Sequence, residues 1–264
     1  MVPGFLIAFL VMLVIPAWGG QKSLQLCLSC HTAHYADRGH CRDCHRGNPA
    51  SARKNIAHAG LREGKYAHFT IGTAVQKRDG DRLVDQLACR RCHVSAGRGN
   101  RLAMNLDVAA ARKSAGELAL SIRRPVINMP NFELDEERTT TLVNAILAGS
   151  QGRKTDVSAP VRIHFSHSGQ KSSDIFSKKC GSCHRLLSER FGAVGTGDVG
   201  PNLSGLLTLY YPKTFGADGV WTAKNLSIWI ENPRKTRPMA NMQPVILTEA
   251  EMKELVSVVH SFSQ

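Results

Sequence analysis

Every cysteine of this 264-residue chain lies in a Cys-x-x-Cys-His motif. The motif occurs four times, at residues 27–31, 41–45, 89–93 and 180–184, and the four copies use all 8 cysteines. Each copy holds two nucleophilic thiols three positions apart, with an imidazole directly after the second thiol. Thiols form covalent bonds with electrophiles, and imidazole is a common metal ligand. The spacing therefore predicts a group that is held both covalently and through a metal.

This spacing is the attachment motif of c-type haem. Two intervening residues set the reach between two sulfurs that add to the vinyl groups of one porphyrin, and the adjacent histidine is the proximal ligand of the iron. We therefore predict four covalently bound haem c groups. The attaching residues are Cys27, Cys30, Cys41, Cys44, Cys89, Cys92, Cys180 and Cys183, and the proximal iron ligands are His31, His45, His93 and His184.

Other uses of paired cysteines are possible in principle. Cys27, Cys30, Cys41 and Cys44 could form a tetrahedral zinc site, because two such pairs provide four thiolates. The eight cysteines could also form a disulfide framework or redox-active dithiols. None of these alternatives explains why a histidine follows the second cysteine in every copy. The four motifs together make the chain resemble the multihaem c-type cytochromes.

Composition and charge agree with an interior built around large cofactors. Aromatic residues make up only 6% of the chain, and four large, flat, apolar haems could replace much of a conventional core. The formal net charge is +13, and ionised haem propionates would lower it to about +9 when oxidised and about +5 when reduced. The remaining positive charge predicts redox partner proteins with acidic docking surfaces. Nucleic acid is not expected as a partner, because the sequence contains no nucleic-acid-binding motif.

Residues 1–20 predict export from the cytoplasm. They contain 11 consecutive apolar residues, from Phe5 to Ile15, followed by Pro16 and small residues, as in a signal peptide. No Lys or Arg precedes the apolar run, and an uncleaved segment would give membrane association instead. In the bacterial cytochromes that the chain resembles, haem is attached outside the cytoplasmic membrane. We therefore expect a periplasmic or otherwise exported protein.

Residues 21–72 are expected to form a first unit with two haems. Its two motifs are so close together that no peptide core fits between them, so the haems must form the interior. This resembles the packing of c3/c7-type cytochromes, in which regular secondary structure is sparse and a second histidine ligates each iron. His34 lies one helical turn after His31 and could serve the neighbouring haem. The candidate distal ligands are His34, His58 and His68, and His40 is a further candidate whose reach is limited by the adjacent Cys41.

Residues 73–150 and 161–264 are expected to be two one-haem domains, joined by a linker at residues 151–160. Hydrophobic periodicity predicts helical structure over 109–122, a helix over 135–147 that Gly149 ends, and a final helix after a capping box at Thr248 and Glu251. Met129 and Met242 are 113 positions apart, whereas the two haem motifs are 91 apart. The third unit thus has 22 additional residues between motif and methionine, which we expect to include the loop 209–219.

Both domains resemble class I cytochrome c. The match is strongest at Gly200-Pro201-Asn202-Leu203, because the family's proline carbonyl there accepts the N–H of the proximal histidine. The second domain lacks this proline. Met129 and Met242 stand where the family has its sixth iron ligand, and Met239 is an alternative to Met242. Three further histidines are expected to be structural: His164, His167 and His260.

The expected fold is mainly α, with a haem-cored first unit of sparse secondary structure followed by two cytochrome c-like helical domains. Methionine on the iron raises haem potential relative to a second histidine. The expected function is therefore a relay of single electrons from the bis-histidine pair to the methionine-ligated haems. The alternatives are a haem enzyme that reduces peroxide or an oxyanion at one open-coordinate haem, and an extracellular filament of stacked haems. Outside the haem ligands, the sequence contains no catalytic residue that we can identify.

Overall fold

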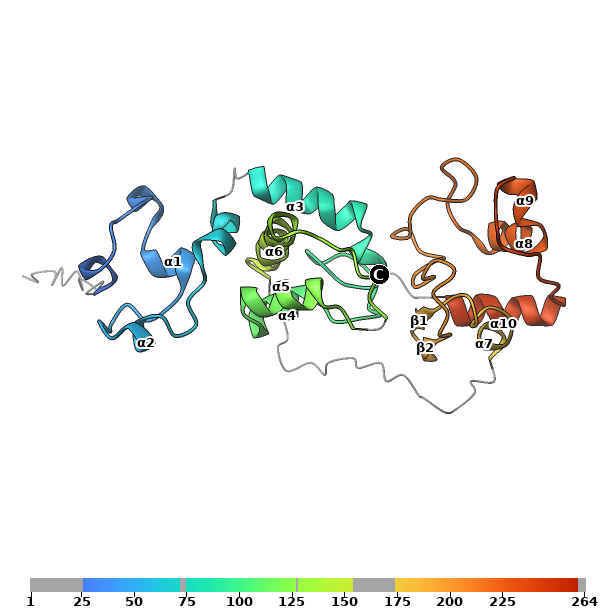
Figure 1. Cartoon of the computed structure of the whole chain (residues 1–264), viewed down its shortest axis with the longest axis horizontal. Coiled ribbons are helices and arrows are strands. Elements are labelled where there is room, and N and C mark those ends of the chain that lie inside the picture. The colour runs from blue at the N-terminus through green and yellow to red at the C-terminus, as the bar shows by residue number, and fades with distance from the viewer. Residues whose placement is uncertain (1–25, 72–74, 127, 154–173, 261–264) are drawn as a thin grey trace, which may run out of the picture.

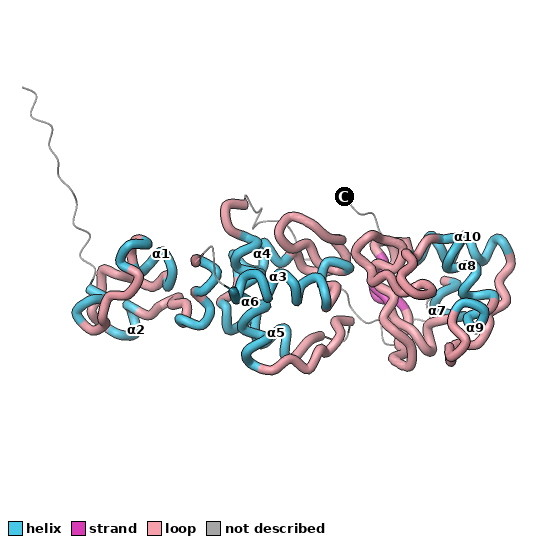
Figure 2. The backbone as a smooth tube through the Cα atoms, turned by 90° about the horizontal axis from the view of Figure 1, so that it is seen from above, coloured by secondary structure: helices cyan, strands magenta, loops and turns pink. Residues whose placement is uncertain are grey.

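The computed structural model describes residues 26–71, 75–126, 128–153 and 174–260. Within these ranges helices predominate, and the only strands are two short ones in the third unit, so the predicted mainly-α fold is confirmed. Three parts follow one another along the long axis of the molecule in the order of the sequence (Figure 1). Loops make up much of the first and third parts, whereas the middle part is the most helical (Figure 2).

The first part contains no residue that is buried by protein atoms between positions 26 and 61. Its helices are single turns, which cannot be stable by themselves without a surface to pack on. The described polypeptide therefore supplies loops and short helical turns here but no core of its own. The elements are η1 (Leu26–Ser29), η2 (Ala36–Arg38), α1 (Cys41–His45) and α2 (Lys54–Ala57).

Two further turns anchor the first part to the second. They are η3 (Gly64–Tyr66) and η4 (His68–Thr70), and the Tyr66 and Phe69 rings lie in the same core cluster as the second unit's helices. Asn144, which is fully buried, donates from Nδ2 to the Lys65 carbonyl at 2.8 Å and accepts from the Phe69 N–H at 2.9 Å. A single amide thus satisfies backbone groups of both turns.

The second part is organised around α6 (Glu136–Ser150), which packs against α3 (Val75–Gln86), α4 (Leu106–Arg112) and α5 (Ala115–Arg123). The predicted helix over 135–147 is confirmed, and the Asp135 carboxylate caps it by accepting the Arg138 N–H at 2.7 Å. The predicted helical stretch over 109–122 is two helices. Ser114 separates them, because it caps α5 through a reciprocal pair of hydrogen bonds with Glu117.

Gly149 does not end α6, contrary to the sequence prediction. It lies inside the helix, where a Cβ atom would come within 3.1 Å of the Ala96 Cβ. The glycine is therefore needed for close approach of the loop after the third haem motif, and the helix continues to Ser150. Sequence spacing alone could not distinguish a packing glycine from a helix terminator.

The third part combines four helices with an antiparallel hairpin that the sequence did not predict. The hairpin pairs β1 (Leu186–Ser188) with β2 (Gly192–Val194). The capping box at Thr248 and Glu251 is confirmed, since each side chain accepts the other's backbone N–H. The helices of this part are α7 (Ile175–Lys179), α8 (Ala223–Glu231), α9 (Pro233–Thr236) and α10 (Glu249–Val259).

Several sequence predictions fall outside the described residues. Residues 1–20, most of the linker 151–160, His164 and His167 are in this group. Among the described helices, none is long and apolar enough to span a bilayer.

Replacing Asn144 with alanine tests the junction between the first two parts. The change leaves the Phe69 N–H and the Lys65 carbonyl without their buried partner, so we expect it to lower the unfolding free energy by about 1 to 3 kcal/mol. Chemical denaturation of the matured protein measures this loss. The matched control is Asn225→Ala, because Asn225 is only partly buried and its one side-chain hydrogen bond, donated to the Val220 carbonyl, is exposed to solvent. An equal, small loss in both variants would contradict the anchoring role.

Candidate haem sites

Each Cys-x-x-Cys-His motif forms one helical turn. The second copy is helix α1, and in the other three the histidine N–H donates to the carbonyl of the first cysteine. Residues at positions i, i+3 and i+4 share a face of a helical turn. Both thiols and the imidazole therefore face the same side, as attachment to one porphyrin requires. The N···O distances are 3.0 Å for His31 to Cys27, 3.0 Å for His93 to Cys89, and 2.9 Å for His184 to Cys180.

Three of the four proximal histidines bond a backbone carbonyl through Nδ1. The partner of His184 is Pro201, at 2.9 Å, as predicted from the sequence. A carbonyl oxygen only accepts, so Nδ1 carries the proton and Nε2 keeps its lone pair for a metal. The other two pairs were not predicted: His45 with the Arg62 carbonyl at 3.1 Å, and His93 with the Met104 carbonyl at 2.6 Å.

The Met104 carbonyl takes the place of the proline that the second unit lacks. His93 reaches it across 11 positions, whereas His184 reaches Pro201 across 17. Six of the additional residues in the third unit therefore precede Pro201, in the segment that contains the β1–β2 hairpin. The remainder follow Pro201 and include the predicted loop 209–219. Burial also lowers the pKa of His93, although its bond to Met104 acts in the opposite direction. The neutral imidazole is the form that ligates metal.

Two of the predicted distal histidines lie beside proximal ones. The Nε2 atoms of His34 and His45 are 3.3 Å apart. The rings of His58 and His31 have their centroids 5.9 Å apart, with a tilt of 38°. His34 thus lies with the histidine of the neighbouring motif rather than its own. His68 begins η4 and has no histidine partner among the described residues.

Met242 and Met239 occupy different environments. Met242 packs against the core of the third unit, and its Sδ accepts the Trp229 Nε1–H at 3.0 Å. Met239 is 88% exposed. Met129 is half-buried at the start of the turn before α6. Of the two candidates in the third unit, only Met242 therefore lies next to the domain interior.

The cysteines suit porphyrin attachment better than the other possibilities. All eight are within the described residues and are free thiols. Burial raises the pKa of Cys89 and of Cys180 to about 11, so these two thiols are protonated at neutral pH. No group of three or more His, Cys, Asp or Glu side chains in the described ranges is arranged to hold a metal ion by itself.

The third motif lies directly against the loop that holds His184. Arg91, inside the third motif, donates from Nη1 to the Asn202 carbonyl at 2.9 Å, and Asn202 follows the Pro201 that bonds His184. Cys92 packs with Leu187 of the hairpin in a small apolar cluster. The second and third units therefore meet where the third haem motif contacts the hairpin and the loop that follow the fourth motif.

Comparison with known protein families agrees with the C-terminal assignment. A family model described as Cytochrome c matches residues 170–263. This segment contains the fourth motif, Pro201 and Met242, so the third unit is similar to cytochrome c domains, which supports a covalently bound haem and a role in electron transfer. No curated protein and no solved structure matches the chain.

Gly200→Ala tests whether the loop around Pro201 positions His184. A Cβ atom at Gly200 would be 2.2 Å from the His184 Cε1, so the ring or the loop must move. We expect the matured variant to lose low-spin character at one haem in its absorption spectrum and to show a changed midpoint potential for that haem.

The control for this experiment is Gly116→Ala. Gly116 lies in α5, and a Cβ atom there would meet nothing within 4 Å. This variant is expected to keep the wild-type spectrum, because alanine is favoured over glycine in a helix. Wild-type spectra and potentials in Gly200→Ala would show that His184 is positioned by something other than this loop.

Proposed function

We propose that this protein is a tetrahaem c-type cytochrome that relays single electrons between redox partners outside the cytoplasmic membrane. The cytochrome c domain at the C-terminus supports haem-based electron transfer. Three further copies of the same attachment motif, each folded into the same helical turn, extend this function to the rest of the chain. Haem c, when bound, supplies a one-electron iron couple.

The pairing of histidines in the first unit is the observation that carries the proposal. His58 beside His31 and His34 beside His45 are two separate pairs, one for each haem motif. We assign them as the two axial ligands of the first and second haems. Both haems are then bis-histidine, which leaves no open position for an external ligand and favours electron transfer over substrate chemistry.

The lack of buried residues over positions 26–61 supports haem-filled packing in this unit. A polypeptide segment of this length needs apolar surface to offset the entropy of ordering, and two porphyrins would provide it. The Arg62 carbonyl further fixes the His45 ring through Nδ1. Such a contact orients the imidazole and strengthens it as a ligand. The residues present therefore fit two haems.

Met129 and Met242 complete the proposal as sixth ligands of the third and fourth haems. A thioether ligand gives a higher potential than a second imidazole, so electrons would move from the N-terminal pair toward the C-terminal domain. Contacts between neighbouring parts occur along the same route, from the first part to the second and from the second to the third. The Thr70 hydroxyl donates to the Cys44 sulfur at 3.2 Å where the first two parts meet, and Arg91 bridges to Asn202 at the next junction.

The charge of the chain supports acidic partner proteins. The net charge is +13 before haem attachment, and complementary charge on a donor or acceptor would speed encounter. Residues 1–20 support export, with membrane association if they are not removed.

Mass spectrometry and an equilibrium redox titration of the matured protein test the function. We expect a mass equal to the mature polypeptide plus four haems, and two groups of potentials, low for two haems and higher for two. Carbon monoxide should not bind to the reduced protein. Stoichiometric carbon monoxide binding would favour the enzyme alternative, and four haems in one narrow low-potential band would contradict the relay.

Separate substitutions of His58 and His68 with methionine test the ligand assignment. We expect His58→Met to raise the potential of one low-potential haem, because a thioether replaces an imidazole on its iron. His68→Met is the matched control and should leave all four potentials unchanged. A titration that resolves the individual haems measures both. The reverse result would assign His68, not His58, as a ligand.

A further inference from the structure

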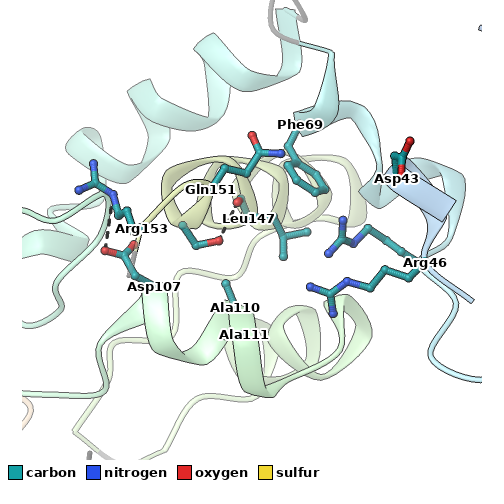
Figure 3. Close-up of a pocket in the computed structure, with 11 residues that line it drawn as sticks. Asp43, Arg46, Phe69, Asp107, Ala110, Ala111, Leu147, Gln151 and Arg153 are labelled. Atoms are coloured by element: carbon teal, nitrogen blue, oxygen red, sulfur yellow. Dashed lines mark hydrogen bonds and ion pairs between the residues drawn. The ribbon is translucent and has the colours of Figure 1, made fainter. Parts of the chain in front are cut away.

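A cavity between the first two parts is lined by charged side chains that have no role in the proposed electron relay. It encloses about 320 Å³, where Arg46 and Arg62 of the first part face helices α4 and α6 of the second. Part of its wall is apolar, formed by Phe69, Ala110 and Leu147. Arg46 extends across the junction toward Leu147 (Figure 3). The cavity therefore has a cationic side and an apolar side.

Arg62 is a buried cation without a carboxylate partner. It is only 8% exposed, and its guanidinium stacks 4.5 Å from the centre of the Phe69 ring. The hydrogen bond from its Nη1 to the Cys44 carbonyl is long, at 3.5 Å. No Asp or Glu oxygen among the described residues lies within 4.0 Å of Arg62 or of Arg46. A guanidinium so far removed from water calls for an anion.

The two carboxylates that line the cavity are already engaged elsewhere. Asp43 caps the start of α1, where its Oδ2 accepts a backbone N–H at 2.9 Å. Asp107 accepts the N–H groups of Ala96 and Gly97 at 2.9 and 2.8 Å and pairs with Arg153 at 4.0 Å, as the dashed line in Figure 3 shows. Neither carboxylate neutralises the two arginines, so the missing anion must come from outside the described polypeptide.

We propose that this cavity is a carboxylate site, and that its occupant is a propionate of the haem attached at Cys41 and Cys44. The inference rests on the proposed function. A porphyrin edge is apolar and ends in a carboxylate, which matches a cavity with an apolar wall and two guanidinium groups. The attachment residues are close, since Arg62 Nη1 lies 3.5 Å from the Cys44 carbonyl. The Arg62 backbone bonds His45 while its side chain holds the propionate, so one residue positions the same haem twice.

The charge of Arg62 can be removed without removing its carbonyl. In matured Arg62→Leu, we expect the potential of one haem of the low-potential pair to fall, because a nearby cation stabilises the reduced, more negative haem. The expected loss is about tenfold in the reduction equilibrium, which corresponds to about 59 mV for one electron. Arg62→Lys should retain most of the wild-type potential, because it restores the charge.

Arg42→Leu is the matched control. Arg42 belongs to the same haem motif and is exposed, and it is not among the residues that line the cavity. Its removal should shift the potential much less, because Arg42 does not line the cavity that would hold the propionate. If Arg62→Leu does not fold, Arg46→Leu replaces it, because Arg46 is exposed and its loss disturbs no packing. Equal shifts in the cavity and control variants would overturn the proposal.

Inorganic phosphate distinguishes the haem propionate from a free anion. With a propionate in the cavity, the wild-type potentials should not change as phosphate is added at constant ionic strength. A phosphate-dependent potential in the wild type that disappears in Arg62→Leu would overturn the propionate assignment and identify a site for a free anion. A matured protein with fewer than four haems would overturn the proposed function instead, so the two failures are distinguishable.

Discussion

The hydrogen bond from the proximal imidazole to a backbone carbonyl is the constraint that shapes the rest of this structure. It fixes which nitrogen carries the proton and leaves the other free to bind a metal. It also forces a loop to return from the haem motif to the ring, and the three loops that do so span 17, 11 and 17 positions. Arg62, Met104 and Pro201 have no side-chain chemistry in common, and only their carbonyl positions are equivalent.

Around this shared bond, the protein stabilises its parts in two different ways. The second and third parts each bury apolar side chains. Val143 on α6 lies in the core of the second part, and Val258 on α10 lies in the core of the third. The first part has no buried residue until Arg62, and it is tied to the rest through η3, η4 and the buried Asn144. The second and third parts can therefore fold around their own side chains. The first part depends instead on the groups that it binds and on its contacts with the second part.

The sequence predicted local capping and hydrogen-bonding features better than the loops that pack against the motifs. Local signals with a clear physical basis were confirmed, such as the capping box at Thr248 and the carbonyl of Pro201. The Met104 carbonyl could not be predicted, because any residue offers a backbone oxygen and the spacing differs from that of the third unit. The β1–β2 hairpin is too short to give a periodic pattern. Gly149 was misjudged because a glycine that permits close packing looks the same in sequence as one that ends a helix.

The burial of Cys92 has a consequence for how the molecule is assembled. This thiol is 8% exposed and is covered by Leu187 of the third part's hairpin. A maturation enzyme that joins a porphyrin to the thiol needs direct access to the sulfur, which the closed arrangement denies. If Cys92 attaches a haem, as proposed, the bond would have to form while the second and third parts are still separated. Docking of the third part would then enclose the linkage, so the contact between Cys92 and Leu187 would set the order in which attachment and domain docking occur.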